Sequence, residues 1–180
     1  MVKSVLTVTL MSLVMPLAGG WTLSPEELDV RPEQRYLLLA TTRTSTMQQE
    51  LSQAARLGFR VLRGAPSGDE VAFFLERTEH PFDSEHYVLL ATSRPETMDD
   101  ELNEMAARGY RLMPETVMWV DCEIVVLMER AASEDARFEY RVLSTSRTST
   151  MQREVHEAAS AGFELVAMES TDDNLVVMER

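Results

Sequence analysis

Short apolar runs alternate with stretches of helical periodicity from residue 35 onward. The run YLLLATT, residues 36–42, is bounded by polar positions and predicts a β-strand. Apolar residues then recur at the three- and four-residue spacing of one helical face: Met47, Leu51, Ala54 and Ala55. We expect Thr46 to cap this helix and Gly58 to end it. The runs RVLR and VAFFLER, joined by the turn-rich GAPSGDE, predict two more strands and hence the order β-α-β-β.

The same order of residues recurs twice more along the chain. Three tyrosines, 51 and 53 residues apart, open the segments: Tyr36, Tyr87 and Tyr140. The hexapeptide RTSTMQ occurs at residues 43–48 and again, letter for letter, at residues 147–152. Agreement of so many residues in a fixed order predicts three tandem repeats. Their predicted bounds are residues 35–77, 87–130 and 138–180, with linkers at residues 78–86 and 131–137.

Strand composition predicts how each repeat is arranged. The last strand is an unbroken apolar run, VAFFL, IVVLM or LVVM, which is typical of a strand buried on both faces. The strand before it contains Pro114 in the second repeat, which suits an edge because proline cannot donate to a neighbouring strand. We therefore expect an α+β protein in which each antiparallel sheet has the strand order first–third–second. One helix per repeat is expected on the outer face.

A helix covers only one face of such a sheet, so the other face needs a second cover. We predict that four apolar residues lie on that uncovered face and form an interaction surface: Leu37, Leu39, Val88 and Leu90. Three covers satisfy this requirement: packing of the repeats on one another around a pseudo-threefold axis, self-association, or an external protein partner.

The first twenty residues have the order of a secretory signal peptide. Lys3 is followed by a mostly apolar run and then by PLAGG, which predicts cleavage after Gly20 and leaves residues 21–34 as an N-terminal linker. An uncleaved anchor is the alternative, although the run is short for a bilayer. We therefore expect a bacterial protein exported to the periplasm or the medium, without a stable membrane anchor after cleavage. Cys122 is the only cysteine, so no disulfide forms within one chain.

The charge balance limits the partners. The formal net charge is −13, from 17 basic and 30 acidic residues, which argues against nucleic acid or an anionic membrane as the main partner. The segments FEYRVLS, EVHEAASAGFELVAM and LVVMER in residues 138–180 resemble a small bacterial domain family of unknown function. The resemblance extends over roughly residues 35–180, although arginine replaces the family's glutamate at positions 60 and 111. It implies the β-α-β-β fold and no particular activity.

An arginine precedes each predicted helix and is the sharpest candidate for chemistry. Helix N-termini attract anions, and arginine adds a bidentate donor, so a carboxylate, a phosphate or a sulfated sugar could bind there. The predicted anion-binding residues are Arg43, Thr44, Arg94, Arg147 and Thr148. The structural alternative pairs each arginine with a glutamate one turn into its helix: Glu50, Glu101 or Glu154.

Other chemistry is weakly indicated. His80 and His86 flank PFDSE without the spacing of a closed metal site, and the methionines lie at core positions. No nucleophile elbow, phosphate loop or paired metal-histidine motif is present, so we expect no cofactor, no metal and no catalysis. The sequence thus predicts an exported interaction protein of unknown partner, with small-anion binding as the alternative and a hydrolase as the remote one.

Overall fold

The computed structural model describes residues 28–133, 137–171 and 173–180. The predicted signal peptide, residues 1–20, lies outside the described residues, as do the first part of the predicted N-terminal linker and the middle of the predicted linker 131–137. Within the described part, the chain is an α+β protein with three α-helices and three antiparallel sheets.

The first sheet, called sheet 1, follows the expected order of elements. Its parts are β1 (Tyr36–Thr41), α1 (Thr44–Arg56), β2 (Phe59–Ser67) and β3 (Glu70–Arg77). Sheet 3 has the same composition: β8 (Tyr140–Thr145), α3 (Thr148–Ser160), β9 (Glu164–Ser170) and β10 (Asn174–Glu179).

Sheet 2 has one additional strand. It comprises β4 (Tyr87–Thr92), α2 (Pro95–Ala107), β5 (Tyr110–Leu112), the 3₁₀ helix η1 (Pro114–Thr116), β6 (Met118–Val120) and β7 (Glu123–Arg130). Pro114 lacks the N–H that a ladder needs, and the edge strand is divided there into β5 and β6, both paired with β7.

The predicted strand order is confirmed in all three sheets. The orders are β1-β3-β2, β4-β7-β5 and β8-β10-β9, with every pairing antiparallel. The strand with the unbroken apolar run lies in the centre each time. It is buried on both faces in sheets 2 and 3, which is why no polar residue interrupts the run.

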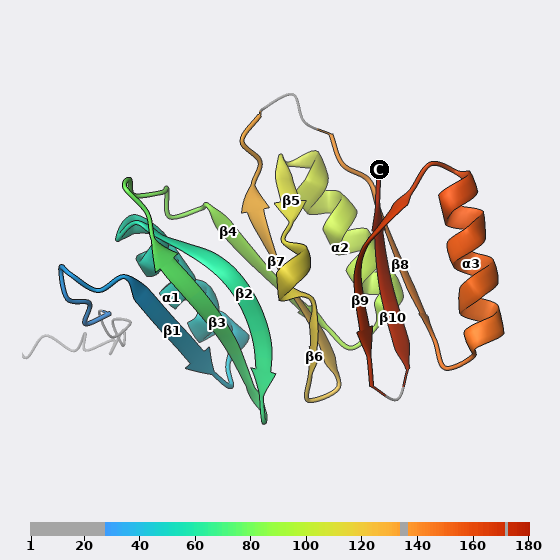
Figure 1. Ribbon diagram of the computed structural model, residues 1–180, viewed down its shortest axis with the longest axis horizontal. Helices are drawn as coiled ribbons and strands as arrows, with labels where there is room; N and C mark the ends of the chain where they lie inside the picture. Colours follow the sequence, from blue (N-terminus) through green and yellow to red (C-terminus); the bar gives the residue numbers. More distant parts are fainter. Residues whose placement is uncertain (1–27, 134–136, 172) are drawn as a thin grey trace, which may run out of the picture.

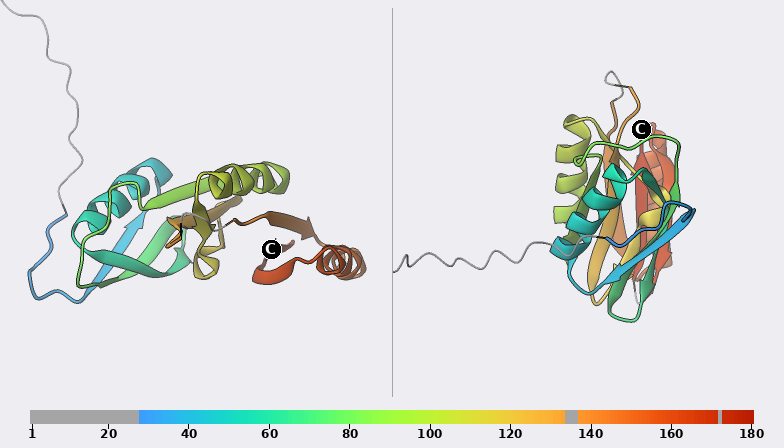
Figure 2. Two further views of the ribbon diagram at one scale, coloured as in Figure 1. Left: turned by 90° about the horizontal axis from the view of Figure 1, so that it is seen from above. Right: turned by 90° about the vertical axis from the view of Figure 1, so that its left-hand side faces the viewer.

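The three sheets follow one another along the longest axis of the molecule (Figure 1). The same row is visible from above, with α3 at one end of the molecule (Figure 2). Helix α1 contacts its own sheet and also β4, and α2 contacts its own sheet and also β8. Only α3 therefore lies on the outside as expected from the sequence. The other two helices lie at the boundaries between successive sheets.

This arrangement divides the core into three apolar clusters. The first joins sheet 1 and α1 to sheet 2, the second joins sheet 2 and α2 to sheet 3, and the third lies between sheet 3 and α3. Alternate residues of β7 belong to different clusters, because successive side chains of a strand point to opposite faces. Val125 and Leu127 face the first cluster, whereas Val126 and Met128 face the second. The face of a sheet that its own helix covers is called its helix face, and the other is called its opposite face.

The sequence placed the predicted interaction residues on the wrong face. Leu37 and Leu39 lie on the helix face of sheet 1 and are buried against α1. Val88 and Leu90 lie on the helix face of sheet 2 and pack partly buried against the second cluster. The continuous run of leucines gave no sign of which alternate residues point inward.

Candidate functional site

A side chain of α1 binds the free edge of the next sheet. Gln48 Nε2 donates to the carbonyl oxygen of Tyr87 over 3.0 Å, and Gln48 Oε1 accepts the N–H of Leu89 over 2.8 Å. Both backbone groups belong to the edge strand β4. A bare edge is a template for pairing with another chain, and here the helix of the preceding sheet satisfies it.

The boundary between sheets 2 and 3 has the corresponding contact. Asp99 follows Met98 as Gln48 follows Met47, and its Oδ1 accepts the N–H of Val142 over 2.7 Å. One turn further along α2, Asn103 Nδ2 donates to the carbonyl oxygen of Tyr140 over 3.1 Å. At each boundary, helix side chains thus hydrogen-bond to backbone groups of the first and third residues of the next edge strand.

A buried tyrosine completes each boundary. The N–H of Val61 donates to the hydroxyl of Tyr87 over 3.0 Å, and that of Leu112 donates to the hydroxyl of Tyr140 over 2.9 Å. Burial, the largest cause in each case, raises the pKa of Tyr87 to about 12 and also raises the pKa of Tyr140. Both hydroxyls therefore stay protonated at neutral pH.

An arginine–glutamate pair lies at the rim of each boundary. Arg60 of β2 reaches Glu129 of β7 at 2.8 Å, and Arg111 of β5 reaches Glu179 of β10 at 2.6 Å. Arg60 and Arg111, which the sequence marks as arginines where the third segment has a glutamate, are therefore both used between sheets. Glu164 occupies the corresponding position in the third segment, and its sheet is the last one that the structure describes.

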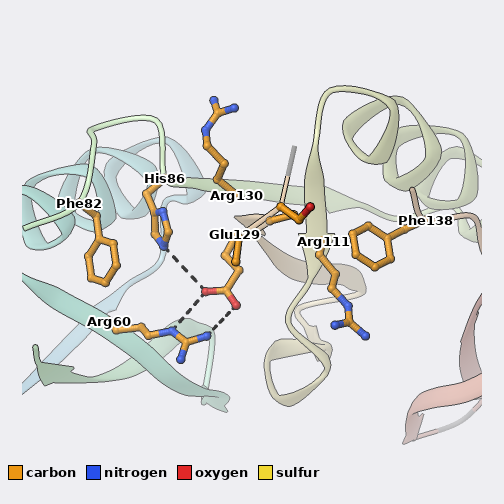
Figure 3. Close-up of a pocket in the computed structure, with 10 residues that line it drawn as sticks. Arg60, Phe82, His86, Arg111, Glu129, Arg130 and Phe138 are labelled. Atoms are coloured by element: carbon orange, nitrogen blue, oxygen red, sulfur yellow. Dashed lines mark hydrogen bonds and ion pairs between the residues drawn. The ribbon is translucent and has the colours of Figure 1, made fainter. Parts of the chain in front are cut away.

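A groove of about 750 Å³ opens beside the first of these pairs. Figure 3 shows Arg60, His86 and Glu129 converging on one side of it and Arg111 beside Phe138 on the other. The guanidinium of Arg111 lies 4.8 Å from the Phe138 ring centroid. In a chain of net charge −13, the groove therefore gathers cationic and aromatic side chains.

Most of this positive charge is already paired. Glu129 binds Arg60 through both carboxylate oxygens, and its Oε2 also lies 3.8 Å from His86 Nε2. Burial, partly against Phe82 at a ring distance of 4.3 Å, lowers the pKa of His86. Glu129 raises this pKa to a smaller extent, and Arg60 and Arg130 lower it further. Arg130 is the most available cation. Its side chain points away from Glu129 in Figure 3, donates to the hydroxyl of Tyr110 over 2.9 Å and meets exposed Glu85 only at 3.8 Å.

The three arginines predicted to bind anions stand at equivalent positions. Each is the N-cap residue of its helix, is exposed, and makes no side-chain cap. Helix α1 begins at Thr44 and α3 at Thr148, so the prediction of Thr46 as the cap is wrong. The chain instead closes a local turn ahead of the helix, because Thr41 Oγ1 accepts the N–H of Arg43 over 3.2 Å.

The structure does not bring these arginines together with the groove, nor does it give them the glutamate partners considered from the sequence. Among the described residues, no ion pair joins Arg43, Arg94 or Arg147 to a carboxylate. Glu154 pairs instead with Arg153 at 3.3 Å. Anion binding at these helix starts stays a prediction.

The remaining candidate groups are dispersed. Cys122 is exposed and lies with Asp121 in the β6–β7 turn, where both residues have positive φ, as a tight two-residue hairpin requires. His80 and His156 are exposed. In the part of the chain that the structure describes, no group of three His, Cys, Asp or Glu residues could hold a metal ion.

The surface that sequence reasoning missed is the opposite face of sheet 1. Four large apolar side chains are exposed there: Tyr36 at 43%, Leu38 at 61%, Leu62 at 43% and Phe74 at 45%. Tyr36 and Phe74 stack with ring centroids 5.6 Å apart. The available signal was the position of sheet 1 at the start of the row, because among the described residues no helix precedes this sheet to cover its opposite face.

Comparison of the chain with protein-family models, curated proteins and solved structures gives no match. The resemblance to the small bacterial domain family therefore stays a prediction. Among the described residues, no helix is long and apolar enough to cross a membrane.

Proposed function

We propose that this chain is an exported, non-catalytic interaction protein, built from three tandem β-α-β-β copies in an open row, that binds a protein partner through the opposite face of sheet 1. The observation that carries the proposal is the exposure of Tyr36, Leu38, Leu62 and Phe74 on one continuous sheet face. Exposed apolar patches of this kind commonly mark interaction surfaces.

The other two sheets indicate what such a face requires. The positions that correspond to Tyr36 and Phe74 are Tyr87 and Leu127 in sheet 2, and these are buried beneath α1 and sheet 1. In sheet 3 the corresponding residues, Tyr140 and Val177, are buried in the second cluster. On sheet 1 the same kind of surface is exposed to water, whereas the chain buries it at two other places. Covering it would be favourable by about 25 cal/mol per Å² of apolar area buried.

Site-specific photocrosslinking in the producing cell tests this proposal. The photoreactive residue p-benzoylphenylalanine is placed at Leu38, and the matched control carries it at Leu57, which is 41% exposed at the end of α1, outside that face. We expect a discrete adduct from position 38 and none from position 57. Absence of any adduct at position 38 would remove the basis for the proposal.

Small-anion binding is the second candidate, and the groove gives it a specific observation. Arg130 lines the same groove as Arg111 and Phe138, and its guanidinium lies 4.7 Å from the Tyr110 ring centroid, without a close carboxylate partner among the described residues. Titration with phosphate or citrate, followed by thermal unfolding, tests it. Loss of ligand-induced stabilisation in Arg130→Ala but not in Arg94→Ala would assign the site to the groove, and the reverse result would assign it to the helix starts. Stabilisation that survives in both variants would exclude both sites.

A further inference from the structure

We propose that the partner on the opposite face of sheet 1 is a second copy of this chain, which docks its C-terminal end there with α3 in the position that α1 holds on sheet 2. This inference rests on the proposed function and names its partner. The contact is head to tail, because the two surfaces belong to opposite ends of the row.

The sequences that would meet between copies nearly repeat a pair that already meets within one copy. At the first boundary, RTSTMQ of residues 43–48 faces YVLLAT of residues 87–92. The C-terminal helix begins with RTSTMQ again, at residues 147–152, and the open edge strand is YLLLAT, residues 36–41. The second internal boundary uses different residues, RPETMD and YRVLST. The sequence pair at the free ends is therefore more similar to the pair at the first boundary than the pair at the second boundary is.

Both ends carry hydrogen-bonding groups for this contact, and one of the acceptors is held by a side chain of its own copy. Gln152 is exposed on α3 at the position of Gln48. On the strand side, Leu38 pairs with Phe74 as Leu89 pairs with Leu127. The N–H of Leu38 therefore faces the free edge of its sheet, as the N–H of Leu89 does. The carbonyl oxygen of Tyr36 accepts Gln34 Nε2 over 2.9 Å, whereas that of Tyr87 accepts Gln48. The half-buried side chain of Gln34, from the same copy, thus occupies the place that the incoming glutamine would take.

Apolar surface is also present at both ends. Leu165 and Met168 of β9 are 54% and 55% exposed and lie opposite Met178 and Val176, which face α3. Leu165 corresponds to Val61, because each lies three residues after the glycine that ends its helix. Val61 is buried beneath Tyr87. Tyr36 of a second copy is the residue that would cover Leu165.

One charge distinguishes this contact from the two internal ones. Glu164 stands where Arg60 and Arg111 reach across their boundaries, and the carboxylate that it would face is Glu76. Arg35, exposed and paired with Glu76 at 2.8 Å, is the cation available to both carboxylates. One arginine shared by two glutamates makes the contact weaker than the internal boundaries, so we expect reversible association. A head-to-tail contact of this kind forms open chains or a closed ring.

A mixing experiment tests the geometry on the protein recovered after expression of the full chain. Leu38→Glu blocks the N-terminal surface, and Leu165→Glu blocks the C-terminal one; both side chains are exposed, so folding is retained and is checked by circular dichroism. We expect each variant alone to associate about tenfold more weakly than the parent. A mixture should form a one-to-one dimer in sedimentation velocity, because each variant keeps one intact surface. Association of Leu165→Glu with itself at parental strength would overturn the head-to-tail geometry in favour of a symmetric contact.

A gain-of-function variant supplies an independent test. Glu164→Arg restores the residue type of both internal boundaries and should tighten association about fivefold. Glu79→Arg makes the same charge change at an exposed linker position and should not. Equal effects of the two variants would contradict the inference.

The crosslinking experiment separates this inference from the proposed function. An adduct at position 38 with a second copy supports both. An adduct with a different protein, together with a parent that stays monomeric and variants that do not pair, retains the proposed function and overturns self-association. Absence of an adduct removes both.

Discussion

The opposite faces of sheets 1 and 2 have closely related residues and different surroundings. Tyr36 and Phe74 are roughly half exposed on sheet 1, whereas Tyr87 and Leu127, at the corresponding positions of sheet 2, are buried. The strands YLLLAT and YVLLAT differ at one residue. Their burial is therefore decided by neighbours: α1 precedes sheet 2, and among the described residues no helix precedes sheet 1.

This difference separates two roles of the same apolar residue. Where a helix of the preceding segment covers it, the side chain contributes to the folding of the row. Where the row begins, the same side chain is available for association. Substitutions at matched positions should therefore affect stability at one site and association at the other.

The largest difference is expected for truncation of the central strand residue. Leu127→Ala removes a side chain that is fully buried in the first cluster and should lower the free energy of unfolding by about 2–5 kcal/mol, because the cavity relaxes only in part. Phe74→Ala, on the open face, should cost less than about 1 kcal/mol. Urea denaturation of both variants at low protein concentration measures the difference. Equal losses would mean that the two faces are equally covered in solution.

The paired tyrosines provide the next comparison. Tyr87→Phe leaves the buried N–H of Val61 without its acceptor and should lower the free energy of unfolding by about 1–3 kcal/mol. Tyr36→Phe, on the exposed face, should have almost no effect. Urea denaturation of the two variants beside the parent measures both changes, and equal losses would contradict the difference in cover.

The same hydroxyl predicts a dependence on alkaline pH. Because burial raises the pKa of Tyr87 to about 12, from about 10 in the unfolded chain, its contribution is fully present below pH 10 and is lost as the pH rises through 12. Unfolding curves between pH 9 and 11 should fall less steeply with pH for Tyr87→Phe than for the parent. Identical slopes for the two proteins would contradict the burial of the Tyr87 hydroxyl.

A smaller effect is expected for the glutamines at the start of the two RTSTMQ helices. Gln48→Ala removes two hydrogen bonds to the edge of β4 and should cost about 1–2 kcal/mol. Gln152→Ala should leave the stability of the isolated chain unchanged, since Gln152 is exposed. Thermal unfolding at low concentration measures both variants, and a matching loss in Gln152→Ala would show that the two positions are not distinguished by cover.

The strand order could be predicted because each rule acted within one segment. An unbroken apolar run such as VAFFL indicated a central strand, and Pro114 indicated an edge, and both predictions agree with the structure. The face of Leu37 could not be predicted, since the five consecutive apolar positions in YLLLA fit either alternation. Only the contact with α1 shows which alternate residues of this strand point to the helix face.

The boundary contacts depend on residues far apart in the sequence. Arg60 and Glu129 are 69 residues apart, and nothing in the sequence near Arg60 indicated Glu129 as its partner. The groove lined by Arg130 and His86 was also not predicted, because it is formed where sheets 1 and 2 and the following linker approach one another. The sequence predicted the strand order within each segment, whereas the cover of each sheet depends on how the segments are arranged in space.

The smallest expected effect, and the most specific one, is the pH dependence of stability that comes from the residue before the first tyrosine of each sheet. Arg35 precedes Tyr36 on the open sheet and is exposed, whereas His86 precedes Tyr87 and is largely buried near Glu129, Arg60, Arg130 and Asp83. Burial lowers the pKa of His86 below its ordinary value of 6.5, so between these two values the unfolded chain binds more protons than the folded one. The contribution of neutral His86 is therefore present above pH 6.5 and is lost as the pH falls through the lowered pKa.

We expect the parent to lose more stability between pH 7.5 and pH 5 than His86→Gln does, while exposed His80→Gln follows the parent. Burial also raises the pKa values of Glu50 and Glu101, but these groups are common to all three proteins and cancel in the comparison. Urea denaturation at each pH measures the three profiles. Parallel profiles for the parent and His86→Gln would show that this histidine is as solvated as its counterpart Arg35, and that the first boundary is open where the structure has it closed.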